Sequence, residues 1–291
     1  MADSQAVASL RTGSVLLCLC ALFLFSALDA TAKHLSAFLA VPLLVWARYL
    51  VHLLIMVLTI LPGQGRGIIL TRRPWLMGLR GVTLAGVTLL GQLALYTLPL
   101  AETTALVFVA PLLVALLAGP LLGEQVRSRT WWATVAGFAG VLLIARPGGN
   151  LAATGVACAL GAALCYAAYQ ILTRKLVATE PPMRLLFYTA LLGTLVMSPV
   201  VPVFWDGRLP SFGQGLLVVS LGVYGGLGHL LLIRAFRETP ASLLSPLLYF
   251  QLVWATLLGW LVFDHLPDLP GIVGMLIIGA SGLSLAIGRQ K

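Results

Sequence analysis

Ten apolar runs of about 20 residues each dominate the sequence. They cover residues 13–35, 41–62, 74–98, 100–122, 130–146, 152–174, 182–203, 211–235, 240–263 and 269–288. A helix of that length crosses the hydrocarbon core of a bilayer. Hydrophobic residues make up 60% of the chain and charged residues 9%, whereas soluble domains are about 25% charged. The sequence therefore predicts an all-α integral membrane protein with ten transmembrane helices, and an eight- or nine-helix count is the structural alternative.

Lysine and arginine are distributed unevenly over the predicted loops. Thirteen of the 18 lie on the side that holds both termini, three lie on the opposite side, and Arg48 and Arg80 lie within helices. Positively charged loops face the cytoplasm, so we expect both termini there. The net charge of +9 then reflects membrane orientation, and we expect a lipid bilayer and no nucleic acid as partner.

A stretch near the middle of the chain returns in altered form near its C-terminus. Residues 98–147 and 239–289 each contain a long apolar run, an acidic residue, a short polar loop and a second run with glycines. The chain thus divides into two five-helix repeats, residues 1–148 and 149–291. Because five is odd, the second repeat is inverted relative to the first. Inverted repeats around a central cavity are typical of alternating-access transporters.

Proline and glycine mark particular helices. Pro111 and Pro246 lie inside the fourth and ninth predicted helices, where each removes a backbone hydrogen bond and can kink the helix. The fifth and tenth helices carry repeated glycines, which favour close helix packing. These glycines predict packing within one chain, with a homodimer interface as the alternative. They are Gly137, Gly140, Gly271, Gly274, Gly279 and Gly282.

The two repeated stretches also resemble a known family. The run LPLAETTALVFVAPLLVALLAGPLLGE, the run WWATVAGFAGVLLIARP and the segment from Thr239 to Arg289 are similar to helices four, five, nine and ten of EamA-type transporters in the drug/metabolite transporter superfamily. The resemblance implies helices one to four and six to nine around a central cavity, with helices five and ten behind. Among the branches, it favours amino-acid exporters of the YddG type, with uptake carriers for adenosyl metabolites or riboflavin as the alternative.

Polar and aromatic residues inside the predicted helices are the candidate substrate contacts, because such residues avoid lipid and face the interior. They form stripes on helices three, six, eight and nine, joined by one arginine on helix two. A cavity of this kind is mostly aromatic and apolar, which suits neutral or zwitterionic organic molecules. Each of these residues could instead serve helix packing. The candidates are Thr88, Gln92, Tyr96, Arg48, Tyr166, Tyr169, Tyr224, His229, Ser245, Tyr249 and Trp254.

Charged residues inside the helices allow more than one interpretation. Arg48 could bind a substrate carboxylate or pair with Asp29 or Glu102. Asp29 and Lys33 are four residues apart and can form an ion pair on one helix face. Glu102 lies at a helix start, where a carboxylate favours the helix dipole. Arg80 is expected to extend to the cytoplasmic interface. His229 could relay protons or serve structural hydrogen bonding.

Catalytic and nucleotide-binding motifs such as HExxH, GxSxG and a Walker A loop do not occur in the sequence. We therefore expect no enzyme activity, cofactor or metal, and a small organic molecule as substrate. A membrane-embedded enzyme is the alternative from a different class, with Asp29, His34 and Glu102 as its best candidate cluster, and a channel is a third. The sequence as a whole predicts a multi-pass protein of the bacterial inner membrane that exports aromatic and other apolar amino acids.

Overall fold

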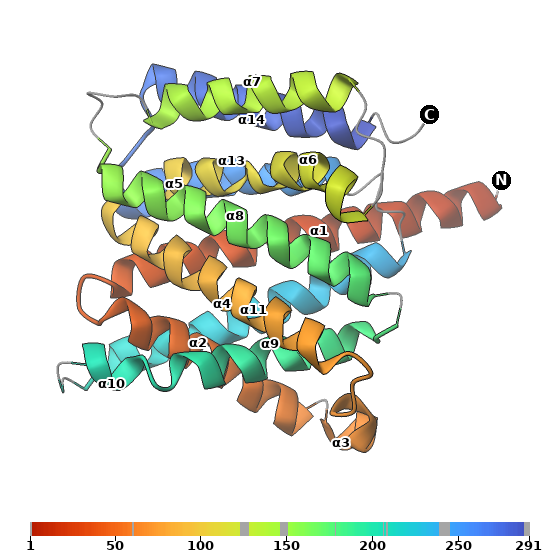
Figure 1. The fold of residues 1–291 in the computed structure, drawn as a ribbon, viewed down its shortest axis with the longest axis vertical. Coiled ribbons are helices and arrows are strands. Elements are labelled where there is room, and N and C mark those ends of the chain that lie inside the picture. The colour runs from red at the N-terminus through yellow and green to blue at the C-terminus, as the bar shows by residue number, and fades with distance from the viewer. Residues whose placement is uncertain are drawn as a thin grey trace.

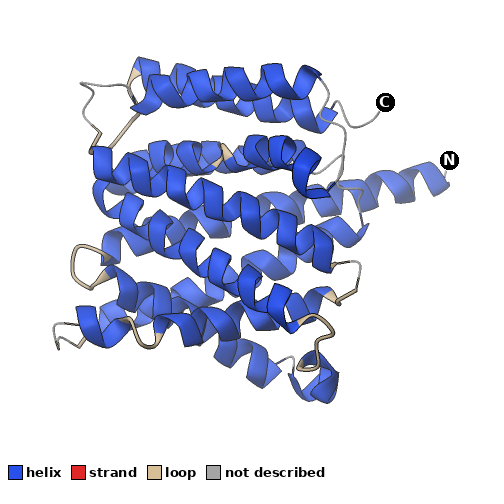
Figure 2. Cartoon of the chain, viewed as in Figure 1, coloured by secondary structure: helices blue, strands red, loops and turns tan. Residues whose placement is uncertain are grey.

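The computed structural model describes the backbone of residues 2–287, apart from 60, 123–127, 146–150, 178, 206, 208 and 239–244. Side chains are described from Gly13 onward, except at a few further positions that include Ser245. Every regular element in this part of the chain is a helix (Figure 2).

The helices follow the predicted runs closely. Proline occupies the first helical position of α4 and α9, where its missing N–H has no partner to lose. In chain order the elements are α1 (Ala2–Leu35), α2 (Val41–Thr59), α3 (Leu61–Gln64), η1 (Gly65–Ile68), α4 (Pro74–Thr97), α5 (Leu100–Val107), α6 (Ala110–Leu122), α7 (Ser128–Ala145), α8 (Ala153–Leu176), α9 (Pro182–Met197), α10 (Val201–Phe204), α11 (Phe212–Glu238), η2 (Ser245–Phe250), α13 (Gln251–Phe263) and α14 (Leu269–Ile287).

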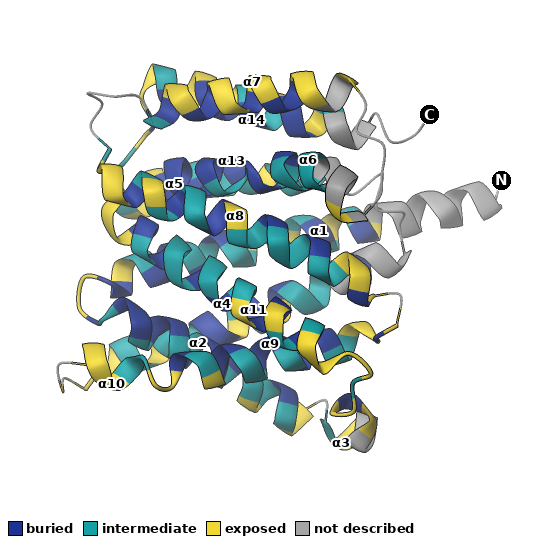
Figure 3. Cartoon of the chain, in the orientation of Figure 1, coloured by how far each residue is buried: buried dark blue, intermediate teal, exposed yellow. Residues whose placement is uncertain are grey.

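Membrane-spanning character is distributed over all ten predicted segments. Among the described residues, five helices are long and apolar enough to span a bilayer, and five further apolar helices are shorter. Large apolar side chains are exposed along the outside of the bundle, for example Trp132 at 73%, Leu142 at 68% and Leu276 at 66% (Figure 3). Apolar surface of this extent requires lipid as its solvent. The predicted all-α membrane fold of two repeats is confirmed.

Helix packing has the pattern of a two-fold relation between the repeats. α4 packs along α8, and α1 packs along α11. α2 contacts α11, and α9 contacts α4 in the same way. If each helix is replaced by the helix five spans away in the chain, the α4–α8 pair becomes α11–α1, and the α2–α11 pair becomes α9–α4. The pairs α2–α9, α5–α13 and α7–α14 become themselves. α1 begins and α14 ends at the same end of the bundle (Figure 1). This is the packing expected of inverted repeats.

The fifth and tenth spans, α7 and α14, form the outermost layer in Figure 1. Their backbones meet at two glycines: a Cβ on Gly140 would lie 2.7 Å from the Gly274 carbonyl oxygen, and a Cβ on Gly274 would lie 2.6 Å from that of Gly140. The glycine pattern therefore serves contact within one chain at this point. The fourth span is interrupted between α5 and α6 at Phe108 and Val109, just before Pro111, as the loss of its backbone donor predicts.

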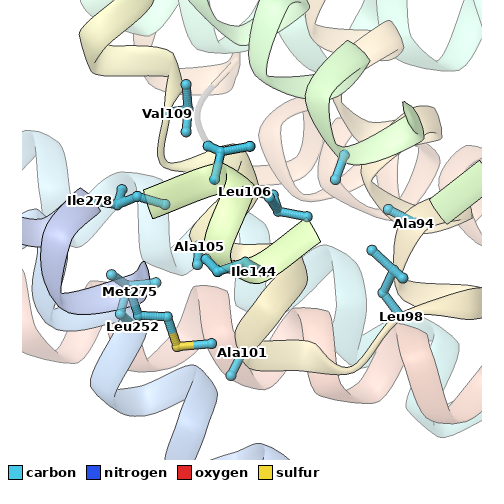
Figure 4. Packing of buried hydrophobic residues seen from close by; sticks show 12 residues of the cluster. Ala94, Leu98, Ala101, Ala105, Leu106, Val109, Ile144, Leu252, Met275 and Ile278 are labelled. Atoms are coloured by element: carbon cyan, nitrogen blue, oxygen red, sulfur yellow. The ribbon is translucent and has the colours of Figure 1, made fainter. Parts of the chain in front are cut away.

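A core of small and branched residues joins the layers. Leu106 and Ala105 on α5 are fully buried between Ile144 of α7 and Ile278 of α14 (Figure 4). Ala94 and Leu98 extend the same cluster toward α4 and α8. Because alanine is small, the helices approach closely at these points. The resulting dispersion contacts stabilise helix association in the membrane.

Candidate substrate-binding site

A buried arginine holds three helices together near the predicted cytoplasmic end. Arg80 on α4 is 4% exposed and donates to Tyr169 Oη at 2.7 Å and Thr173 Oγ1 at 2.7 Å on α8. It also donates to the Leu185 carbonyl at 3.0 Å and to Thr189 Oγ1 at 2.9 Å on α9. The predicted extension of Arg80 to the cytoplasmic interface is wrong, because this side chain faces α8 and α9 rather than lipid.

The aromatic candidates on α8 border this network. The Tyr169 ring lies under the Arg80 guanidinium, 4.5 Å from centroid to Cζ, and stacks with the Tyr166 ring at 6.0 Å. About two turns further toward the outer end of α4, Thr88 shares a hydrogen bond of 2.6 Å with Tyr49 of α2. Tyr49 also donates to the Leu84 carbonyl at 3.1 Å. Tyr169 and Thr88 therefore both have hydrogen-bond partners on neighbouring helices in this structure.

Gln92 differs from its neighbours on α4. Its side chain is buried, 4% exposed, and the described residues provide no hydrogen-bond partner for Oε1. A buried amide oxygen without a partner is destabilising by about 1–3 kcal/mol, so such an atom needs water or a ligand. Gln92 is thus the predicted candidate on α4 whose geometry fits substrate contact best.

A second polar group lies between α1, α2 and α11. His52 on α2 is 5% exposed, and its Nε2 has no partner among the described residues. Its ring is nearly parallel to that of His229 on α11, with centroids 6.4 Å apart and an interplanar angle of 11°. Arg48 lies one turn before His52, and its charge acts on both imidazoles and on Asp29 of α1. The structure thus brings the candidates Arg48 and His229 together.

Tyr96 is placed away from the other α4 candidates. It is 59% exposed and lines a cavity of about 350 Å³ at the predicted outer end, together with Lys33, His34 and Phe38. Lys33 donates to the carbonyl oxygens of Leu95 and Leu98 at 2.6 and 2.7 Å. Lys33 therefore does not form the expected ion pair with Asp29. Its ammonium group instead binds the C-terminal end of α4, where the helix dipole favours a cation.

The two repeats are also connected at this outer end. Glu102 in the first turn of α5 is 5% exposed, and its Oε1 lies 3.1 Å from His265 Nε2. The α13 helix ends at Phe263 and is followed by Asp264, whose φ of 50° is left-handed. The His265 N–H then donates back to the Gly259 carbonyl at 3.1 Å. This helix ending turns His265 toward Glu102. A further cavity of about 260 Å³ borders His265, Lys33 and Gly259.

At the opposite end, Glu180 connects loops of the two repeats. It is 2% exposed and accepts hydrogen bonds from Thr71 Oγ1 at 2.7 Å, the Arg72 N–H at 2.9 Å and the Arg184 guanidinium. Arg184 also donates to the Gly67 carbonyl at 2.6 Å. Burial alone would raise the pKa of Glu180, but these hydrogen bonds and the charge of Arg184 lower it below its ordinary value.

The remaining candidates lie in apolar surroundings. Tyr249 packs against Gly282 of α14 and lies 5.5 Å from the Phe108 ring, so it faces the back helices. Trp254 meets Phe23 of α1 edge to face at 5.3 Å. Tyr224 packs against a cluster around Leu28 and Leu221. The hydroxyl of Tyr249 and the Trp254 Nε1 have no partner among the described residues. The side chain of Ser245 lies outside the described residues.

Sequence reasoning missed His52, Tyr49 and Glu180. A signal for His52 was present, because it lies four residues after Arg48 inside an apolar run and so shares its helix face. Tyr49 and Glu180 offered no pattern, since their partners come from other helices. The structure as a whole is a helix bundle whose interior contains buried polar side chains between the two repeats.

A comparison with protein-family models shows to which family a chain of this architecture belongs. The model of the EamA-like transporter family matches twice, over residues 12–146 and 153–286. The chain belongs to the EamA-like transporter family. The family assignment predicted from the repeated stretches is thus confirmed, and the protein is a small-molecule transporter of the membrane.

Characterised relatives of this EamA-like transporter differ in their substrates. An S-adenosylmethionine uptake transporter of Rickettsia prowazekii is 27% identical over 78% of this chain and 76% of its own length. The pseudopaline exporter CntI of Pseudomonas aeruginosa is 28% identical over 96% of this chain and 98% of its own. A riboflavin transporter of Vibrio cholerae is 29% identical over 66% of this chain and 62% of its own length. All three are transporters, but at this identity they leave the substrate class open.

A solved crystal structure shares the fold. It matches with a TM-score of 0.67 and 21% identity over 97% of this chain and 100% of the other. The likeness covers both repeats.

Proposed function

We propose that this EamA-like transporter is a secondary carrier that exports amino acids, aromatic and other apolar ones included, by alternating access. The observation that carries the proposal is that a carboxylate side chain and a guanidinium lie near each other in an apolar interior. Asp29 on α1 and Arg48 on α2 are half-buried and within electrostatic reach of each other. The ammonium and carboxylate of a zwitterion are complementary to such a couple.

The surroundings support an apolar or aromatic body for the substrate. The Arg48 side chain lies beside the α11 backbone at Gly225, so helices of both repeats border the couple. Phe25 and His229 pack together at 4.9 Å on one side. Inverted-repeat carriers bind substrate between their halves near the bilayer midplane, which fits this location.

Counterflow in proteoliposomes tests the proposal. Vesicles loaded with unlabelled amino acid should accumulate labelled phenylalanine and leucine saturably, which also separates a carrier from a channel. Robust transport of riboflavin or S-adenosylmethionine without transport of any amino acid would contradict the proposal. Chemical conversion of the substrate would instead support the membrane-embedded enzyme.

Gln92→Ala provides a second test of the binding region. Because Gln92 Oε1 is buried and has no partner in the described part of the chain, we expect the variant to lose at least tenfold in transport efficiency while keeping the wild-type melting temperature. Lys175→Gln is the matched control, since Lys175 is exposed at the end of α8. Wild-type rates for Gln92→Ala would remove Gln92 from the site.

The second candidate function is uptake of a nucleoside-like metabolite or riboflavin. The stacked pair Tyr166–Tyr169, together with the named substrates of the Rickettsia and Vibrio relatives, favours it. Aromatic rings with parallel faces can stack on adenine or flavin. The same proteoliposome panel decides between the two functions.

The orientation and assembly of the chain complete the proposal. We propose that both termini face the cytoplasm of a bacterial inner membrane, because positively charged residues collect on that side. Cysteines introduced near each terminus should react with a membrane-impermeant reagent only after the membrane is opened. A homodimer through α7 and α14 is a further expectation that cross-linking between copies would test.

A further inference from the structure

The polar group between α1, α2 and α11 contains more hydrogen-bonding capacity than its protein partners use. His52 Nε2 is buried and has no partner among the described residues, although a protonated imidazole nitrogen is a good donor. Leaving a buried polar atom unpaired is unfavourable, so its position calls for a bound molecule or water. The geometry of the surrounding helices shows which chemical group would fit.

The backbone of α11 lies in van der Waals contact with this group. Gly225 and Gly226 lack side chains, so Arg48 Nε comes within 3.6 Å of where a Cβ on Gly225 would lie. The His52 ring reaches within 3.4 Å of the corresponding point on Gly226. Arg48 and His52 occupy the same face of α2, one turn apart. Their polar atoms are therefore held against the second repeat rather than against lipid.

Charge in this region favours an anion. Arg48 brings a guanidinium to this group, and the charge of Arg80 also acts on His229. Asp29 on α1 is a carboxylate residue within electrostatic reach of Arg48. An arginine fork with an adjacent imidazole donor matches the two oxygens of a carboxylate. His229 holds the His52 ring by parallel stacking, which fixes the direction in which Nε2 points.

We propose that Arg48 and His52 form the subsite for the carboxylate of the transported molecule, with His229 as the positioning residue for His52 and Asp29 facing its ammonium group. This inference deepens the proposed amino-acid transport and rests on it. It adds His52 and a defined orientation: the charged head lies at the α2–α11 contact, and the apolar body extends into the interior.

A series of related compounds tests the subsite. Purified wild-type protein in proteoliposomes carries out counterflow of labelled L-phenylalanine, with four competitors: L-phenylalanine, L-phenylalanine amide, phenethylamine and 3-phenylpropionate. The two compounds with a carboxylate should inhibit, and the amide and the amine should need at least tenfold higher concentrations. Equal inhibition by phenethylamine would overturn the inference.

Variants separate the subsite from folding. Arg48→Gln and His52→Leu should each raise the concentration of phenylalanine for half-maximal counterflow at least tenfold and should abolish the preference for carboxylates. His52→Gln should keep much of the preference, because the glutamine amide nitrogen can take the place of Nε2. Lys175→Gln serves as the charge-removal control. Unchanged carboxylate preference in Arg48→Gln and His52→Leu would refute the subsite and leave amino-acid transport standing.

A binding measurement covers the case in which phenylalanine is not carried, which would refute the proposed function itself. Thermal stabilisation of the detergent-purified protein by 3-phenylpropionate, lost in Arg48→Gln, would still support a carboxylate subsite. Stabilisation that is absent, or equal in the variant, would overturn it.

Discussion

Arg80 offers the most direct test of how this helix bundle is held together. In the structure its guanidinium makes four hydrogen bonds that connect α4 to α8 and to α9. We expect Arg80→Ala to destabilise the protein, because both neighbouring helices lose their polar contact with α4 at once. The aromatic contact with Tyr169 is lost at the same time.

The expected magnitude follows from these contacts. A hydrogen bond between membrane helices contributes about 0.6 kcal/mol on average and up to about 1.7 kcal/mol. The energy of a bond from a guanidinium donor lies toward the upper end of this range, because charge-assisted hydrogen bonds are stronger. Four such bonds give a gross loss of about 5–7 kcal/mol. The desolvated charge disappears with the side chain, which reduces the expected net loss to about 2–4 kcal/mol. Thr173 and Thr189 keep their own hydroxyl bonds to Tyr169 and Leu185 carbonyls, which limits the loss.

A double-mutant cycle measures the interaction itself. Arg80→Ala, Thr189→Ala and the double variant are compared by equilibrium unfolding in mixed micelles, with Arg234→Ala as a control at an exposed arginine on α11. We expect a coupling energy of about 0.5–1.5 kcal/mol between Arg80 and Thr189. Additive effects, or an Arg80→Ala variant as stable as the control, would refute the reasoning.

Three further predictions concern other contacts. Because hydrogen bonds lower the pKa of Glu180, its stabilisation should be complete above about pH 4.5 and fade as the pH falls, so wild type and Glu180→Gln should converge in melting temperature in acid. Gly140→Val should reduce stability by about 1–3 kcal/mol, because the new side chain meets the Gly274 carbonyl; an unchanged melting temperature would count against this contact. Glu102→Gln should speed amide hydrogen exchange at His265, and unchanged exchange would show that Glu102 does not hold that loop.

The helices were predictable from the sequence because the bilayer imposes their length. An apolar run of about 20 residues must form helix in lipid, whatever its neighbours do. The two repeats followed from the same pattern. The boundary between residues 148 and 149 stays a prediction, although the family model matches on either side of it.

The faces of the helices were harder to predict than their ends. Thr88, Gln92 and Tyr96 are spaced by four residues, but an α-helix has about 3.6 residues per turn, so each step rotates by about 40°. Over two steps Tyr96 turns about 80° away from Thr88, which is enough to move it from the interior to the exposed outer end. Arg80 shows the same limit of sequence-based prediction. Its depth in the membrane could be predicted from the sequence, but the direction of its side chain depends on Thr173 and Thr189 of other helices.

The two symmetry-related contacts differ in their polar content, and this difference bears on transport. Where α4 meets α9, Arg80 donates two hydrogen bonds, to the Leu185 carbonyl and to Thr189 Oγ1, so these helices are expected to move as one body. Where α11 meets α2, His52 Nε2 has no partner among the described residues, and three glycines, Gly222, Gly225 and Gly226, lie against α2. Among the described residues, separating α11 from α2 therefore breaks fewer hydrogen bonds than separating α4 from α9. A carrier that rearranges around bound substrate should open at the contact that the substrate itself completes, and the α2–α11 contact meets that condition.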